Sequence, residues 1–181
     1  MCVVKMSPVD DTIRPMLQRD LELVLAWRNH IDIRKYMYSQ HKISHAEHEQ
    51  WFEKSQRDIH RHLLIFEIDD VPKGFISLAT DSNKVADWGF YAAPGVPKGT
   101  GSRLGIAALN YAFTEVGLHK ICGQALAFNT RSIKFHETLG FKLEGVLREQ
   151  YFDGLTYSDV LCFGMLQYEW CRDNQEKNAN K

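Results

Sequence analysis

A glycine-rich turn directly before a long apolar helix is the feature that most constrains the fold of this chain. The turn covers residues 96–103 and follows an aromatic segment, 87–91. Gly99 and Gly101 allow backbone amides to approach a ligand, and the unpaired N–H groups and positive dipole end of the following helix face the same point. Lys98 and Arg103 add positive charge nearby. The segment therefore indicates a site for an anion such as a pyrophosphate.

Two familiar phosphate loops do not fit this segment. A Walker loop would close with Gly-Lys-Ser/Thr, and a dinucleotide fingerprint would carry a third glycine within a parallel strand–helix–strand unit. A pair of glycines before a helix is also often a plain turn. From this feature alone, an anion site and a plain turn both stay open.

Hydrophobic periodicity gives the remaining elements. It predicts helices over 21–28 and from an N-cap at Ser44, strands over 62–68, 75–78 and 87–91, a helix over 104–116, a strand over 120–127, a helix over 129–140, and strands over 143–152 and 157–166. This order indicates an α/β fold in which helices flank a mixed, mainly antiparallel sheet.

Size and charge narrow the class of protein. With 181 residues, the chain is expected to form one domain over 1–171 with a polar tail over 172–181. The formal net charge of −1 disfavours a general nucleic-acid binder, which needs massed Lys and Arg. No apolar run approaches the length of a membrane helix, and the N-terminus lacks a long apolar signal segment. We expect no membrane partner and a cytoplasmic location.

Three histidines raise the question of a metal. His41, His45 and His48 lie close in sequence, and His48-Glu49 begins like a zinc protease motif. Phe52 stands where the second histidine of that motif is required, so the motif fails. We expect no metal site.

A second motif, over residues 129–141, turns these features into a family resemblance. Its Asn129, Ser132, Glu137 and Gly140-Phe141, together with the glycine turn, resemble the Gcn5-related N-acetyltransferase (GNAT) superfamily over nearly the whole chain. The segments around Gly145 and the Asp153-Gly154 turn are similar to its ribosomal-protein-acetyltransferase-like branch. The resemblance implies a GNAT fold of about seven strands, with acetyl-CoA as co-substrate and no metal.

The resemblance also implies site residues. Asn129 and His136 are the implied catalytic residues, His136 occupying the position where the family usually has a Tyr that acts as general acid. Val96 stands where the family loop usually begins with Arg or Gln. The implied cofactor-binding residues are Phe90, Tyr91, Ala92, Lys98, Gly99, Thr100, Gly101, Ser102, Arg103, Asn129, Ser132 and Phe135.

The first third of the chain is similar to one group of these enzymes. Residues 27–30, 37–39 and 43–51 resemble the flagellar-sugar N-acetyltransferases of pseudaminic acid synthesis, which acetylate the 4-amino group of a UDP-linked amino-dideoxy sugar. The resemblance implies this nucleotide sugar as the small-molecule partner, and flagellin glycosylation as the pathway. The implied substrate-binding residues are Arg28, Met37, Tyr38, His48 and Trp51.

Other functions stay open at this point. The same scaffold acetylates protein N-termini or polyamines, and a non-catalytic acyl-CoA-binding module would also fit the missing Tyr. A polyamine site should be rich in carboxylates, and the acidic residues of the first third are scattered. No residue stands out as general base, since Gln124, on the strand facing the site, cannot act as one. A homodimer is a further open expectation.

Overall fold

A computed structural model of the chain describes residues 11–171. Within these residues lie, in chain order, β1 (Asp11–Pro15), the 3-10 turn η1 (Gln18–Asp20), α1 (Leu21–Asn29), α2 (Ile31–Arg34), α3 (His45–Gln56), β2 (Arg61–Ile68), β3 (Val71–Thr80), β4 (Val85–Ala92), α4 (Thr100–Thr114), β5 (Lys120–Leu126), α5 (Thr130–Leu139), β6 (Lys142–Phe152) and β7 (Tyr157–Leu166). The proposed tail, 172–181, lies outside the described residues.

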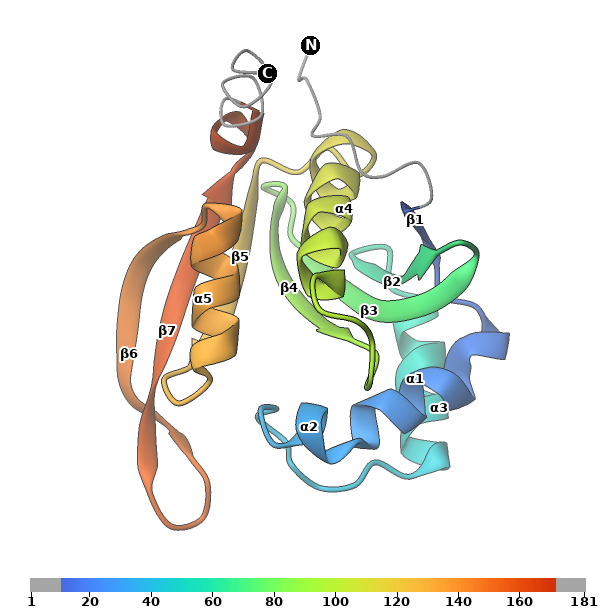
Figure 1. Cartoon of the computed structure of the whole chain (residues 1–181), viewed down its shortest axis with the longest axis horizontal. Coiled ribbons are helices and arrows are strands. Elements are labelled where there is room, and N and C mark those ends of the chain that lie inside the picture. Colours follow the sequence, from blue (N-terminus) through green and yellow to red (C-terminus); the bar gives the residue numbers. More distant parts are fainter. Residues whose placement is uncertain (1–10, 172–181) are drawn as a thin grey trace.

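The strands form one seven-stranded sheet in the order β1-β2-β3-β4-β5-β7-β6 (Figure 1). Every neighbouring pair is antiparallel except β4 and β5. The predicted fold, a mixed and mainly antiparallel sheet flanked by helices, is therefore confirmed. The helical interpretation of the first third missed β1, a short strand that pairs with β2 from Asp11↔Ile68 to Pro15↔Leu64, and it missed the four-residue α2.

Local sequence signals set the ends of two helices. Ser44 begins α3 as predicted, because its Oγ accepts a hydrogen bond from Glu47 N at 3.3 Å while Glu47 Oε2 accepts one from Ser44 N at 2.7 Å. Asn129 begins α5 in a similar way, since its Oδ1 accepts from Ser132 N at 3.1 Å. Gly140 ends α5 in the left-handed conformation, at φ 96°.

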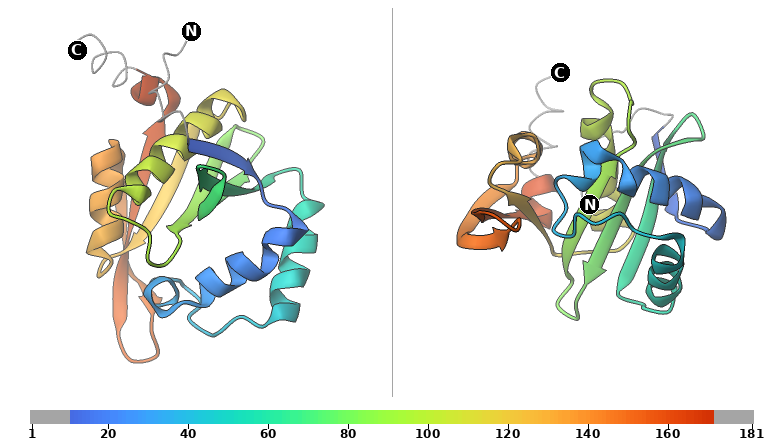
Figure 2. Two further views of the ribbon diagram at one scale, coloured as in Figure 1. Left: turned by 45° about the vertical axis from the view of Figure 1, so that its right-hand side comes forward. Right: turned by 90° about the horizontal axis from the view of Figure 1, so that it is seen from below.

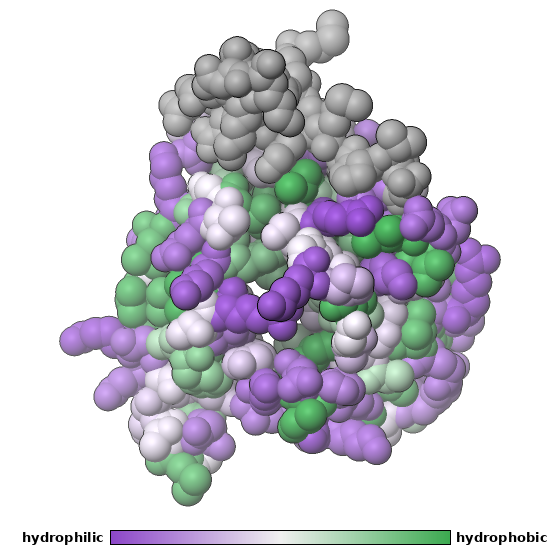
Figure 3. All heavy atoms as spheres, viewed as in Figure 1, coloured by the Kyte–Doolittle hydropathy of each residue, from purple (hydrophilic) through white to green (hydrophobic). Residues whose placement is uncertain are grey.

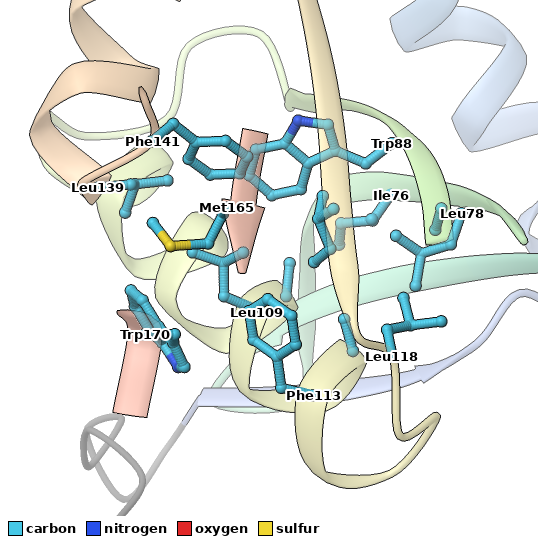
Figure 4. Close-up of a cluster of buried hydrophobic side chains, with 14 of the residues drawn as sticks. Ile76, Leu78, Trp88, Leu109, Phe113, Leu118, Leu139, Phe141, Met165 and Trp170 are labelled. Atoms are coloured by element: carbon cyan, nitrogen blue, oxygen red, sulfur yellow. The ribbon is translucent and has the colours of Figure 1, made fainter. Parts of the chain in front are cut away.

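Helices cover both faces of the sheet, and strand alternation assigns the faces. Leu63 and Ile65 of β2 pack with the cluster that includes α1 and α3, whereas Leu64 and Phe66 pack with the cluster that includes α4. In Figures 1 and 2, α1, α2 and α3 accordingly gather apart from α4 and α5. The larger cluster fills the space between α4 and the middle strands, where Trp88 lies against Phe141 (Figure 4).

The sheet opens between its two central strands. β4 and β5 pair over three residue pairs only, Val85↔Lys120, Ala86↔Ile121 and Asp87↔Cys122. Beyond these pairs the two strands diverge, as Figure 1 shows, and the sheet becomes a wedge. A parallel pair so short leaves the following part of β4 without a strand on that side.

A buried hydrogen bond lies at the apex of this wedge. The indole N–H of Trp88, on β4, donates to Nε2 of His136, on α5, over 3.1 Å. Gly123, on β5, lies directly beneath, and a Cβ atom at this position would collide with both rings. Glycine is needed here because of close approach, which joins β4, β5 and α5 at one point.

We predict that Gly123→Ala destabilises the protein by about 1–3 kcal/mol, the usual effect of forcing an extra carbon into a packed core. The added methyl group must push His136 and Trp88 apart. Urea unfolding followed by circular dichroism measures the change.

Gly145→Ala, on the edge strand β6, is the matched control, because a Cβ atom there meets nothing within 4 Å. Equal stability of the two variants would contradict the close packing described at Gly123.

Candidate active site

A cavity of about 720 Å³ fills the opening between β4 and β5. In the space-filling view, this face of the molecule is hollowed near its centre, with hydrophilic residues around the rim (Figure 3). Segments far apart in the sequence contribute its walls: residues 32–33 and 35–38, the outer half of β4 with the following loop, the start of α4, β5, and the start of α5. Of the predicted site residues, it is lined by Met37, Tyr38, Phe90, Tyr91, Ala92, Gly101, Asn129, Ser132 and Phe135.

The glycine turn meets this cavity at the beginning of α4. Gly99 is the N-cap of α4, with φ 92°, and no side chain caps the helix end. A Cβ atom at Gly99 or Gly101 would meet nothing within 4 Å, so the space in front of the helix is open. A 15-residue helix that presents uncapped N–H groups to open space suits a phosphate or pyrophosphate. This end of the cavity therefore fits the diphosphate of coenzyme A.

The two basic residues of the turn have different surroundings: Lys98 faces solvent and Arg103 pairs with a carboxylate. Arg103 instead binds β1, because its Nε donates to Asp11 Oδ1 at 3.0 Å and the Asp11 side chain is only 1% exposed. Arg103 does not line the cavity, and neither do Lys98, Gly99, Thr100 or Ser102. The ion pair with Asp11 anchors the first turn of α4 to the edge of the sheet.

The two faces of β4 line the cavity with different chemistry. Phe90 contacts Phe135 of α5, with ring centroids 4.4 Å apart, whereas Tyr91 contacts Phe75 on the opposite face at 5.3 Å. Asp87 and Gly89 share the face of Tyr91 because side chains alternate along a strand. The cavity thus passes through the sheet, from the α4–α5 side to the side of α1–α3.

His136 lies in the core beneath this cavity. Its side chain is 1% exposed, and it is absent from the cavity wall. Its Nδ1 lies 2.8 Å from Ser132 O, and its Nε2 accepts from Trp88. A carbonyl oxygen only accepts and an indole N–H only donates, so the ring is neutral, with its one proton on Nδ1. Burial lowers the pKa of His136. This geometry gives His136 a packing role, and its proton-donor role stays a prediction.

The predicted acceptor residues divide into lining and supporting groups. Met37 and Tyr38 line the cavity. His48 stacks on Trp51 at 5.0 Å, and Trp51 contacts Phe75, so these two rings stand behind Tyr91 rather than at the cavity. Burial lowers the pKa of His48.

Arg28 and Arg34 both stand outside the cavity wall, although Ile33 and Lys35 on either side of Arg34 line it. Arg28 Nη2 donates to Ser39 O at 2.8 Å. In the part of the chain that the structure describes, two buried nitrogens have no hydrogen-bond partner, Arg28 Nη1 and Arg34 Nε. Burial is the main cause that lowers the pKa of Arg28, and the charge of Arg34 lowers it further.

The sequence analysis did not single out Asp87, which lines the cavity, or Arg34, whose two chain neighbours line it. Asp87 lines the cavity at the last pairing position of β4 and β5. A polar residue within an aromatic strand, on the face of Gly89 and Tyr91, is the signal that could have identified it. Arg34 gave no comparable signal, since a surface helix often carries an arginine.

Among residues 11–171, no group of three or more His, Cys, Asp or Glu side chains could hold a metal ion. Within the same residues, no helix has the length and apolar character that crossing a membrane requires.

Comparisons with known proteins agree with this geometry. The family model described as "Acetyltransferase (GNAT) domain" matches residues 12–142. The chain is 31% identical over 124 residues to the uncharacterized N-acetyltransferase YokL of Bacillus subtilis, covering 67% of this chain and 70% of that protein. It is 27% identical over 142 residues to the acetyltransferase PseH of Campylobacter jejuni, covering 78% and 88%. The structure of spermidine N-acetyltransferase from Vibrio cholerae in complex with CoA and spermine superposes with a TM-score of 0.83 at 26% identity, covering 90% and 99%.

The buried state of His136 predicts a pH dependence of stability. A free imidazole titrates near pH 6.5, and the pKa of His136 in the fold is lower, so acid favours the unfolded chain, which binds the extra proton. The contribution of His136 is complete above about pH 6.5 and falls by up to about 1.4 kcal/mol per pH unit below it. Urea unfolding at pH 7.5, 6.5 and 5.5 should show a steeper loss for the wild type than for His136→Gln.

His48 and His62 also have pKa values lowered by burial, and both remain in the variant, so the difference between the two proteins isolates His136. Identical pH slopes would remove His136 as the source. The same variant tests proton donation, because an unchanged kcat for acetyl transfer would exclude His136 from that step.

Proposed function

The chain belongs to the GNAT acetyltransferase family, and we propose that it acetylates the 4-amino group of UDP-4-amino-4,6-dideoxy-N-acetyl-altrosamine, in pseudaminic acid synthesis for flagellin glycosylation. Transfer of acetyl from acetyl-CoA to an amine follows from the family. The nucleotide-sugar acceptor is the proposal. The observation that carries it is a pair of half-buried arginines, Arg28 and Arg34, of which Arg28 lies close to Tyr91 on the acceptor side of the cavity.

These arginines favour an anionic acceptor. A buried N–H group without a partner is costly, more so on a charged side chain, and native proteins rarely leave one unpaired. Arg28 Nη1 and Arg34 Nε are two such groups, and each guanidinium repels the other. A diphosphate in the cavity would be attracted by both guanidinium charges, and arginine matches phosphate oxygens well once a shift of the side chains exposes these nitrogens. The resemblance to PseH supports the same acceptor.

A polyamine is the second candidate, favoured by the likeness to spermidine N-acetyltransferase. A polycation requires carboxylates. Two carboxylates line the described cavity, Asp32 and Asp87, and Asp32 accepts a hydrogen bond from Lys35 Nζ at 2.9 Å. Arg131 also lines the cavity. The balance of charge around the acceptor side therefore favours the sugar.

The protein binds and orients acetyl-CoA through main chain. The uncapped start of α4 suits the diphosphate. On the side of β4 that faces β5, residues Phe90 to Ala92 offer backbone groups that pair with no strand of the described sheet. When bound, acetyl-CoA supplies an activated acetyl thioester. The phenyl rings of Phe90 and Phe135 make the adjoining wall apolar and exclude water.

Asp87 is the proposed proton acceptor of the reaction. The neutral amine attacks the thioester carbonyl carbon, the C–N bond forms as the C–S bond to CoA breaks, and the amine loses a proton while the CoA thiolate gains one. Asp87 lines the cavity at the point where β4 and β5 separate, on the acceptor face. Its carboxylate can take that proton directly or through one water molecule.

We predict that the enzyme releases CoA thiol with the UDP-4-amino sugar at a kcat/KM about 100-fold or more above that with spermidine, because a site built for hydrogen bonds rejects molecules that leave its groups unpaired. Arg34→Gln should raise the KM of the sugar about tenfold or more, the loss of one charged hydrogen bond. Thiol release measured with a chromogenic disulfide gives both values.

Arg57→Gln, at an exposed arginine beyond α3, is the matched control for lost charge. Turnover with spermidine alone would overturn the sugar proposal in favour of the polyamine. Tight CoA binding without turnover of any amine would support a binding module instead.

Asp87→Asn should lower kcat by about 100-fold or more, the typical contribution of a general base, while the KM of acetyl-CoA stays within about twofold. The alkaline side of the pH–rate profile should partly recover activity, because there the amine is already neutral. Glu137→Gln, at an exposed carboxylate on α5, is the control. A kcat equal to that of the control would exclude Asp87 from proton transfer.

A further inference from the structure

We infer that Tyr38, held by Gln124, positions the attacking amine by accepting one of its N–H hydrogen bonds. This inference rests on acetylation of an amine and holds for either acceptor considered above. The role is more specific than the substrate contact that sequence resemblance implies for Tyr38, and it gives Gln124 a function that is not proton transfer.

Tyr38 and Gln124 lie in contact at the cavity. Tyr38 and Gln124 both line the cavity, Tyr38 from the segment after α2 and Gln124 from β5. Tyr38 Oη donates a hydrogen bond to Gln124 Oε1 at 2.7 Å, from a segment 86 residues away in sequence. Tyr38 as a whole is 55% exposed, and it forms part of the cavity wall.

The direction of the hydrogen bond between Tyr38 and Gln124 determines what the Tyr38 hydroxyl can still do. A phenol has one proton to donate and can also accept. Since the proton of Tyr38 goes to the amide oxygen of Gln124, the hydroxyl oxygen of this cavity-lining residue keeps its capacity to accept a hydrogen bond. Burial raises the pKa of Tyr38, which keeps the phenol protonated and the bond to Gln124 in place.

An amine that attacks the thioester needs hydrogen-bond acceptors for its N–H groups. A neutral primary amine must direct its lone pair at the carbonyl carbon, which leaves two N–H groups for the protein to hold. Asp87 lies on β4 opposite Cys122, and Gln124 is two residues further along β5, on the same face. Asp87 can receive the N–H that is lost, and Tyr38 Oη can accept the other. Such positioning contributes to rate through orientation.

The segment that carries Tyr38 is fixed by a second contact outside the cavity. Gln40 Nε2 donates to Tyr151 Oη at 2.6 Å, and the rings of Tyr38 and Tyr151 meet edge to face at 5.9 Å. Tyr151 is absent from the cavity wall. This second contact allows the hydroxyl of Tyr38 to be separated experimentally from the anchoring of its segment.

The experiment is steady-state kinetics of thiol release, with the UDP-4-amino sugar or, if the enzyme prefers it, spermidine. Tyr38→Phe keeps the ring and removes the oxygen. It should lower kcat/KM for the amine about tenfold, the effect of one lost hydrogen bond, with the KM of acetyl-CoA within about twofold. Gln124→Leu alone should lower kcat/KM for the amine about threefold. Added to Tyr38→Phe, it should cause no further loss, because Gln124 acts only through Tyr38.

Tyr151→Phe is the matched control, since it removes a hydroxyl from the other contact of the same segment, and it should stay within about twofold of the wild type. An equal loss in Tyr151→Phe would assign the effect to anchoring and overturn the inference. Additive effects of Tyr38→Phe and Gln124→Leu, or an unchanged kcat/KM in Tyr38→Phe, would also overturn it. A change of acceptor from sugar to spermidine would refute the proposed function alone.

Discussion

The site depends on how briefly β4 and β5 pair. Three residue pairs hold the halves of the sheet together, and after Asp87↔Cys122 the strands separate. A fully paired sheet would close the cavity and use the main-chain groups of β4. The separation provides a passage whose two faces differ, apolar toward α4 and α5 and polar toward α1–α3. The hydrogen bond between Trp88 and His136 lies where the passage begins and links β4 to α5.

Sequence alone predicted the parts of the fold that local chemistry determines. Ser44 and Asn129 cap their helices through side chains a few residues away, and the glycine turn precedes α4 as its composition indicates. β1 escaped detection because five residues with no clear alternation carry little signal, and its strand exists only through pairing with β2. The approximate ends of β4 and β5 could be predicted from the sequence, but the residue at which the two strands separate could not.

Site residues that act through their main chain or belong to a motif could be predicted from the sequence. The surroundings of a side chain could be predicted less well where contacts with distant parts of the chain determine them. Nine of the predicted residues line the cavity. Arg103 carries the charge expected near a diphosphate, yet a buried carboxylate, Asp11, 92 positions away holds it. His136 occupies a motif position, but the donor and acceptor rules of its two neighbours commit both ring nitrogens. Such partners come from distant strands, which no local pattern reveals.

The contact between Trp88, Gly123 and His136 has a consequence for how sequences of this kind can change. A larger residue at 123 has room only if the side chain at 136 is smaller or adopts another orientation. A residue at 136 without a hydrogen-bond acceptor leaves the indole N–H of Trp88 unpaired in an apolar interior. The three positions are therefore expected to covary as a unit, each restricting the substitutions that the other two tolerate. Relatives with a different side chain at 136 should carry compensating residues at the other two places.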